Sequence, residues 1–427
     1  MIAYKTFARF QTISTIKNIF RRVVAGKTII CVYIPELSAS QKPLYLYGNM
    51  KNTYIRRHEG DYRATEADLR RFIRESDDNL DGALLADYTL ADLNANSILA
   101  FKNIMDLRKP SSHYLAMDNL DFLTEMGVYR LDRTDGRKPK LTVAGLLFLG
   151  KLDAIQQKFP HFHLDYINQR GCRDGERWKD RVCTGDLNYA NLNVFEFFRI
   201  VSEKLRATIE DPFELDENSV RKTPVELDTA LREALANMLI HADYFDAETD
   251  IKVTVENYYY TFQNPGKMRV SIAQYFAGGT SSPRNNTLIL YFRRMGISDR
   301  AGTGGKTILN FAVDNKFEKP EINTDMARTS LKIWVASPLK AHTELDNNTK
   351  RILEYIDQNR MGTMSQLRQA TGMTAYQVHK AIKKLLALQL IITRGRGRAT
   401  TYLWAPSVVE RVDAADRLRD FIINNDF

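Results

Sequence analysis

The residues from 223 to 241 constrain the fold more than any other part of the chain. Apolar side chains recur there at helical spacing and predict a buried helix face made of Leu227, Leu231, Ala234, Leu235 and Met238. Glu233, Asn237 and His241 stand four residues apart, so they form a polar line beside that face. The sequence TPVE at 223–226 adds a capping residue, a proline at the first helical position and the glutamate of a capping box. A helix with adjacent core and polar stripes suits the floor of a pocket.

The residues after this helix predict a strand pair followed by glycine-rich turns. Residues 249–264 alternate between apolar and polar side chains, which predicts two strands ending at Asn264-Pro265-Gly266. A second polar turn, residues 282–286, precedes a predicted helix, and residues 299–305 lead into another. Glycines at a helix N-terminus leave backbone N–H groups free to bind phosphate. GGKT at 304–307 matches only the end of the P-loop pattern.

Four motifs carry a resemblance to a known superfamily. They are EALANMLIHADY at 233–244, FQNPG at 262–266, SPRNN at 282–286 and DRAGTGG at 299–305. In this order they resemble the N box and the two glycine boxes of the GHKL ATPases (gyrase, Hsp90, histidine kinase, MutL). They resemble more closely a divergent branch in predicted bacterial transcriptional regulators with a Schlafen/AlbA-type N-terminal domain. The resemblance implies a GHKL, Bergerat-like α/β sandwich over residues 206–340 that binds ATP and Mg²⁺.

The resemblance also implies a role for each matching residue. Asn237 would hold Mg²⁺, and Glu233 matches the carboxylate that orients or deprotonates water in members that hydrolyse ATP. Asn264 stands where an adenine-reading aspartate is usual, and Ala242 replaces a common arginine. The other ATP-site candidates are His241, Gly266, Arg284, Asn285, Gly302, Gly304 and Gly305. Binding is better supported than hydrolysis, and a fold kept for packing without nucleotide remains the alternative.

Residues 349–405 predict a second, separate unit. Helices are expected at 350–359, 364–370 and 374–388, with Thr374 as a cap, and two strands follow. The apolar face of the third helix is expected to comprise Val378, Ile382, Leu385 and Leu386. This pattern resembles a winged helix-turn-helix, which reads DNA with its last helix. Its DNA-binding candidates are Tyr376, Gln377, Lys380 and Lys383 on that helix and Arg394, Arg396 and Arg398 in the wing. A winged helix used for protein contacts is the alternative.

The N-terminal residues 27–76 resemble the second half of a Schlafen/AlbA-type domain, so residues 1–78 are assigned to a partial domain of that type. The early acidic motif of the family is not found, and nuclease activity is therefore not expected. Gly48-Asn49 predicts a hairpin turn, and Thr65 predicts a helix start. His58 is expected at the surface of a basic hairpin.

The rest of the chain completes an α+β multidomain architecture. Residues 79–205 are expected to be a mostly helical connecting region, with a strand at 161–167 and a helix at about 191–208. Residues 406–427 are expected to form a C-terminal helix.

Composition narrows the function class. The formal net charge of +9 and a pI of about 9.2 favour a polyanionic partner such as double-stranded DNA. No apolar run approaches the ~18–20 residues of a membrane span, and no signal-peptide pattern is present, so a cytoplasmic location is expected. The cysteines Cys31, Cys172 and Cys183 lack zinc-site spacing. A homo-oligomer is expected, because winged-helix regulators often read paired half-sites.

The sequence therefore predicts an ATP-binding, DNA-binding transcriptional regulator. An ATPase of DNA processing or phage defence is the second hypothesis. A transcription factor with a vestigial nucleotide pocket is the third.

Overall fold

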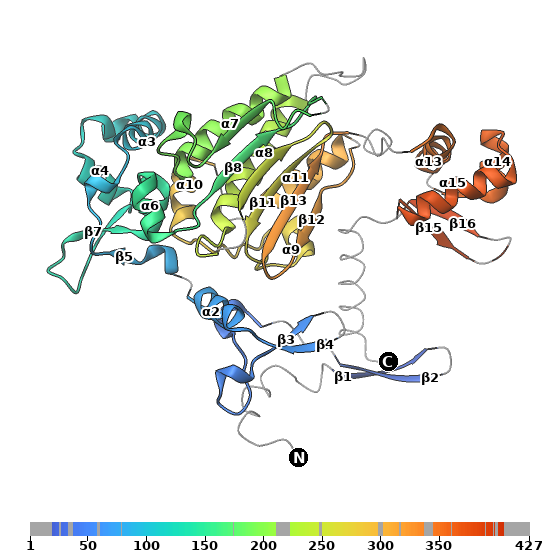
Figure 1. Ribbon diagram of the computed structural model, residues 1–427, viewed down its shortest axis with the longest axis horizontal. Coiled ribbons are helices and arrows are strands. Elements are labelled where there is room, and N and C mark those ends of the chain that lie inside the picture. The colour runs from blue at the N-terminus through green and yellow to red at the C-terminus, as the bar shows by residue number, and fades with distance from the viewer. Residues whose placement is uncertain are drawn as a thin grey trace.

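A six-stranded sheet lies at the centre of the computed structural model (Figure 1). Its strand order is β12-β13-β11-β10-β8-β9. The strands are β8 (Leu164–Asn168), β9 (Asp180–Cys183), β10 (Ile251–Val255), β11 (Tyr259–Pro265), β12 (Glu321–Thr324) and β13 (Arg328–Trp334). Only β8 and β10 run parallel; the other neighbours are antiparallel.

The structure describes residues 19–24, 27–32, 37–57, 60–77, 79–173, 175–210, 223–246, 250–297, 302–315, 317–336, 345–359, 361–388, 390–395, 397 and 400–404. None of the helices in these ranges is long and apolar enough to cross a membrane.

Alternating side chains explain why β10 and β11 form and which face they bury. Val253 of β10 and Phe262 of β11 are buried, whereas the residue that follows each of them, Thr254 or Gln263, is half-buried. Period-two alternation of this kind is typical of a sheet with one face packed on a core. The helices that pack against one another beside this sheet are α7 (Val194–Glu210), α8 (Thr223–His241), α9 (Ile272–Ala277), α10 (Leu288–Arg294) and α11 (Gly304–Asp314). The predicted strand pair is confirmed.

The central sheet begins before residue 206, where the sequence had suggested a boundary. β8 pairs with β10 in register Ile251↔Leu164, and β9 extends the edge. The strand predicted at 161–167 is present as β8, which spans Leu164–Asn168, but it belongs to this sheet rather than to a connecting region. A local pattern shows that a strand exists but not which distant strand it joins, and here the crossover between the parallel strands includes α7 and α8.

Residues 79–150, which we call the middle unit, are not uniformly helical. They form a small sheet of order β5-β7-β6 beside several helices. Its elements, with the helix that follows, are β5 (Leu84–Leu85), α3 (Ala95–Arg108), α4 (Asn119–Glu125), β6 (Tyr129–Leu131), β7 (Pro139–Thr142), α5 (Val143–Leu149) and α6 (Leu152–Lys158). Its buried side chains belong to the same apolar core as those of the central sheet. Phe148, for example, contacts both Phe195 and Phe292.

The N-terminal residues form two hairpins and a helix: β1 (Ile19–Val24), β2 (Lys27–Val32), β3 (Tyr54–Arg57), β4 (Gly60–Arg63) and α2 (Glu66–Glu75). A turn does form at Gly48-Asn49: Asn49 N donates to the Leu46 carbonyl, and an antiparallel bridge joins Tyr45 to Thr53 on either side of it, although no named strand pair flanks the turn. The Asn49 side chain then accepts a hydrogen bond from Lys51 N and starts a short 3-10 turn within the same connection. The predicted start of α2 is confirmed: Thr65 and Asp68 form a reciprocal capping box. His58 lies outside the described residues.

The C-terminal unit has its own core, separate from the central one. Its elements are α13 (Asn347–Asn359), β14 (Met361–Thr363), α14 (Met364–Thr371), α15 (Ala375–Ala387), β15 (Ile391–Arg394) and β16 (Thr401–Trp404), in a sheet of order β14-β16-β15. The three predicted helices and the Thr374 cap are confirmed. Leu386 is more exposed than predicted because it lies beyond the inward face formed by Val378, Ile382 and Leu385. The predicted helix at 406–427 lies outside the described residues.

Candidate nucleotide site

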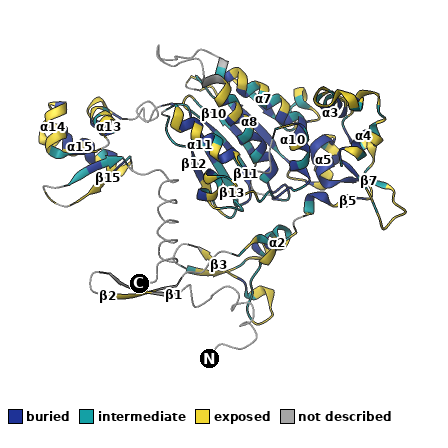
Figure 2. Ribbon diagram, turned by 180° about the vertical axis from the view of Figure 1, so that it is seen from behind, coloured by how far each residue is buried: buried dark blue, intermediate teal, exposed yellow. Residues whose placement is uncertain are grey.

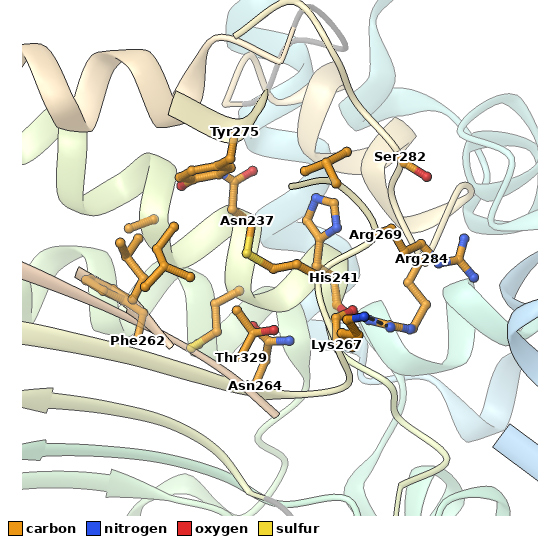
Figure 3. Close-up of a pocket in the computed structure, with 16 residues that line it drawn as sticks. Asn237, His241, Phe262, Asn264, Lys267, Arg269, Tyr275, Ser282, Arg284 and Thr329 are labelled. Atoms are coloured by element: carbon orange, nitrogen blue, oxygen red, sulfur yellow. Dashed lines mark hydrogen bonds between the residues drawn. The ribbon is translucent and has the colours of Figure 1, made fainter. Parts of the chain in front are cut away.

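The polar line of α8 borders a pocket above the central sheet (Figure 3). Glu233, Asn237 and His241 are half-buried, whereas the predicted apolar face of the same helix is buried. Asn237 and His241 line the pocket directly. The spacing that the sequence shows therefore gives one helix a packed side and a side that faces a cavity. Thr223 and Pro224 belong to α8, but their side chains are not described.

A cluster at one end of the pocket joins α8 to the glycine-rich turn. The amide nitrogen of Asn237 lies 3.5 Å from Glu233 Oε1. Gly304, the first residue of α11, approaches both side chains so closely that a β-carbon would collide with the Glu233 carboxylate. Burial first, and then the charge of Glu233, raises the pKa of the Tyr275 hydroxyl, which bonds Asn237. The tyrosine therefore stays protonated and can donate.

The other two glycines of this turn also permit close packing. Gly302 has a φ of +62° and lies against the backbone of Thr280. Gly305 lies against the backbone of Tyr275. Side chains at these positions would separate α11 from the segment 275–280. Residues 299–301 of the motif lie outside the described residues.

The sheet supplies the opposite wall of the pocket. Phe262 and Asn264 of β11, Ile322 of β12, and Thr329 and Leu331 of β13 line it. The Asn264 amide nitrogen donates to the Pro265 carbonyl at 2.9 Å. A carbonyl can only accept, so the nitrogen must face it and the Asn264 oxygen must point elsewhere. The Asn264 oxygen is therefore not used in this bond and remains an uncharged acceptor, where an aspartate would offer a charged one.

Three cations line the rim, and the described lining residues include no carboxylate. They are Lys267, Arg269 and Arg284. Burial, followed by the charges of Arg284 and Arg269, lowers the pKa of His241 to about 3, so its imidazole is neutral at pH 7. This side of the pocket suits a ligand that carries negative charge.

Arg284 serves the protein's own structure as well as the pocket. Its guanidinium donates to the carbonyls of His241 and Lys267 and pairs with Glu75 at 2.8 Å. Gly266, with φ of +94°, leaves the space that this guanidinium fills. Gly266, one of the predicted ATP-site residues, therefore makes room for Arg284.

Asn285 also bonds protein rather than facing the cavity. Its amide nitrogen donates to the carbonyls of Ile240 and Ala242 at 2.8 Å each. These carbonyls belong to the end of α8 and the residue after it, so Asn285 caps the helix that carries the polar line. It is buried and is not among the described lining residues. Asn285 therefore holds the end of α8 in place.

Helix α2 is held against this site by ion pairs that the sequence gave no sign of. Arg71 pairs with Asp246 at 2.9 Å and Arg74 with Asp243 at 3.0 Å, and both carboxylates are almost fully buried. Arg269 donates to the Glu75 backbone carbonyl at 3.0 Å. The C-terminal end of α2 therefore contacts the residues that follow α8 and two of the rim cations.

The predicted DNA-binding residues lie on the exposed side of the C-terminal unit. Tyr376 is 76% exposed, and Lys380, Lys383 and Arg394 are exposed as well. The Gln377 side-chain oxygen is used locally, because it accepts from the Thr374 backbone at 2.9 Å in the capping box of α15. Only its amide hydrogens are left to contact a partner. Arg396 and Arg398 lie outside the described residues.

Magnesium would depend on a bound ligand here. Among the described residues, no three His, Cys, Asp or Glu side chains gather to hold a metal ion by themselves. Asn237 and Glu233 place two oxygen-bearing side chains together at the end of the pocket. Mg²⁺ commonly takes one or two protein oxygens and completes its shell with phosphates and water. The residues present fit that mode.

Comparison with known proteins relates two stretches of the chain to families. Residues 249–333 match the family described as "Putative ATP-dependent DNA helicase recG C-terminal". Residues 70–165 match a domain of unknown function, DUF8451. No curated protein matches the chain. The crystal structure of the DIP2311 protein from Corynebacterium diphtheriae aligns with 90% of this chain and 75% of that one, at 15% identity and a TM-score of 0.45.

The first match covers the sheet wall, the rim and the glycine-rich turn. It includes Asn264, Arg284 and Gly304 but begins after α8, so it says nothing of Glu233, Asn237 or His241. The chain therefore contains a region related to the RecG C-terminal family of ATP-dependent proteins within a mixed α+β multidomain structure.

Proposed function

We propose that this chain is an ATP-binding, DNA-binding transcriptional regulator, in which a GHKL-type pocket is coupled to a C-terminal winged helix. One observation carries the nucleotide part: Asn237 and His241 of α8 line one pocket together with Asn264 of β11, and Gly304 of α11 lies directly against the Asn237 side chain. The family match to residues 249–333 supports it.

The lining of the pocket suits each part of ATP. Apolar side chains such as Met238, Phe262 and Leu331 form a wall for a flat purine. The Asn264 oxygen would accept from the adenine amino group. Phosphates would bind near the first turn of α11, where Gly302, Gly304 and Gly305 offer backbone N–H groups. When bound there, Mg²⁺ would be held by Asn237 and would neutralise phosphate charge.

The C-terminal unit would supply DNA binding. Its helices and three-stranded sheet follow the winged helix-turn-helix order, and α15 presents Tyr376, Lys380 and Lys383 to solvent. Cations on an exposed helix attract phosphates, and the N-terminal residues of a recognition helix contact base edges. A homo-oligomer that reads paired half-sites belongs to this proposal.

ATP hydrolysis is a second candidate function, favoured by the position of Glu233. Its carboxylate lies beside both Asn237 and Gly304, where it would act on water next to the phosphates. Steady turnover that is lost in Glu233→Gln and retained in Glu226→Gln, an exposed glutamate on the same helix, would support this function.

Calorimetric titration with Mg-ATP and a non-hydrolysable analogue tests the nucleotide site. The proteins to compare are wild type, Asn237→Ala and, as a matched control, Asn310→Ala on the exposed face of α11. Saturable binding in wild type and Asn310→Ala, lost in Asn237→Ala, is expected. Absence of heat in wild type with both ligands would contradict the nucleotide site.

A further inference from the structure

The middle unit has the same strand and helix order as the C-terminal unit. In the C-terminal unit, β14 is followed by two helices and a hairpin, and the sheet order is β14-β16-β15. In the middle unit, β5 is followed by α3, α4 and the hairpin β6–β7, and the sheet order is β5-β7-β6. In both sheets the first strand along the chain pairs antiparallel with the third. The second strand along the chain (β15 or β6) also pairs with the third and forms one edge of the sheet. The hairpin β6–β7 therefore occupies the position of a wing.

The tip of this hairpin is basic and exposed. Arg133, Arg137 and Lys138 are exposed, and their side chains form no hydrogen bond or ion pair with any described part of the chain. In Figure 2 the loop that leads into β7 extends away from the body of the molecule and is coloured as exposed. Lys138 N bonds the Asp135 carbonyl, and Asp132 N bonds the Lys138 carbonyl at 2.9 Å, so backbone bonds define the shape of the loop.

The carboxylates of the loop do not cancel this charge. Lys140 pairs with Asp132 at 2.8 Å and with Asp135 at 2.9 Å. The Lys140 bond, helped by Thr134, holds the pKa of the Asp132 carboxyl well below its usual range, so it stays ionised and paired. One lysine thus neutralises part of two acidic side chains, and the three outer cations are left to solvent.

The helix next to this hairpin differs from α15 in a way that limits what the unit can bind. The exposed residues of α4 include Asp121 and Glu125, whereas α15 exposes Lys380 and Lys383. An acidic helix would be repelled by the phosphates that flank a DNA groove. Base reading through α4 is therefore excluded, and contact is left to the hairpin tip.

We propose that the β6–β7 hairpin, through Arg133, Arg137 and Lys138, is a second nucleic-acid contact that binds the phosphate backbone of double-stranded DNA without reading sequence. The inference rests on DNA being the partner of the chain. It gives the matched domain of unknown function a role: it holds a DNA segment while the C-terminal unit supplies base contacts.

The test measures DNA affinity of the full chain by fluorescence anisotropy over a range of salt concentrations. The hairpin variant is Arg133→Ala, Arg137→Asn, Lys138→Ala; asparagine is chosen at 137 because this residue has a φ of 59°. The control, Lys151→Ala, Lys158→Ala, Arg206→Ala, removes the same charge from exposed positions elsewhere. Unchanged circular dichroism and melting establish that both variants fold.

The hairpin variant is expected to bind a 20–30 base-pair duplex about tenfold more weakly and to lower the salt slope by about two to three, roughly one for each lost phosphate contact. The control is expected to change affinity by less than about twofold. Equal affinity of the hairpin variant and the control for DNA would overturn the inference, as would a loss seen only with single-stranded RNA. Failure of the wild type to bind DNA would instead overturn the DNA part of the proposed function.

Discussion

The pocket and the C-terminal unit use their polar residues in opposite ways. At the nucleotide site, predicted ligand-binding side chains are bonded to the protein. In the pocket lining, Arg284 bonds two carbonyls and Glu75, and Asn237 bonds Glu233; behind the lining, Asn285 bonds the end of α8. In the C-terminal unit, Tyr376, Lys380, Lys383 and Arg394 extend from α15 and β15 into solvent.

This difference predicts how each region responds to change. A residue that bonds the protein contributes to the free energy of unfolding as well as to binding, so its substitution alters both. A residue on an exposed helix face affects binding alone. The two cores are also separate, so heating should unfold the two regions in distinguishable steps.

Arg284→Ala should have the largest effect on stability. It leaves Glu75, which is 13% exposed, without its partner, and breaking a buried pair costs about 3–5 kcal/mol. In thermal unfolding, the melting temperature of the region that contains the central sheet should fall by many degrees. Arg56→Ala, which breaks a pair with both side chains 64% exposed, should cost about 0–1 kcal/mol. Equal shifts in the two variants would show that Arg284 is not a structural residue.

Gly304→Ala should come next. Its β-carbon would collide with the Glu233 carboxylate, and overpacking of this kind costs about 1–3 kcal/mol. The double variant Gly304→Ala/Glu233→Ala removes the Glu233 carboxylate and should therefore regain most of the stability lost in Gly304→Ala. A double-mutant cycle of melting curves measures this recovery. If the two costs simply add, Gly304 and Glu233 are not in contact.

His241 should make the pocket region sensitive to acid. Its folded pKa of about 3 lies below the unfolded value of about 6.5, so the unfolded chain binds more protons between these values. Stability is full above pH 6.5 and falls as the pH decreases towards 3. When the pH falls from 7 to 5, the free energy of unfolding should decrease by about 1–2 kcal/mol less in His241→Gln than in wild type.

The melting midpoints of wild type, His241→Gln and His161→Gln at both pH values test this claim. His161 is exposed, so its variant should follow wild type. If the melting midpoint falls equally between pH 7 and 5 in all three proteins, His241 is not the group that makes the protein sensitive to acid.

Lys380→Ala should have the smallest effect on stability, within about 0.5 kcal/mol, because the side chain is exposed. It should nevertheless weaken DNA binding a few-fold and reduce the salt slope by about one. Lys151→Ala is the matched control. A lower melting temperature of Lys380→Ala, with no change in the salt slope of its DNA binding, would contradict the division between the two regions.

Features that depend on neighbouring residues could be predicted from the sequence. The buried stripe of α8, the alternation in β10 and β11, and the caps at Thr65 and Thr374 follow from side chains within a few positions of one another. The spatial meeting of Asn237 with Gly304 was anticipated through the order of motifs rather than through any local pattern.

Features that depend on distant pairing could not be predicted. Glu75 reaches Arg284 across more than two hundred residues, and β8 joins β10 across a long crossover. Arg284 and Asn285 illustrate the limit most directly. Their residue types suggested contacts with a ligand, but tertiary packing gives them buried backbone carbonyls to bond.

The most direct test of the account is the affinity of the full chain for a DNA duplex with and without saturating Mg-ATP, in wild type and in Asn237→Ala. The account predicts that ATP changes the wild-type affinity, that DNA changes the ATP affinity by the same factor, and that Asn237→Ala shows neither effect. If ATP binds and the DNA affinity is unchanged, the pocket and the C-terminal unit are independent, and the proposed coupling is wrong.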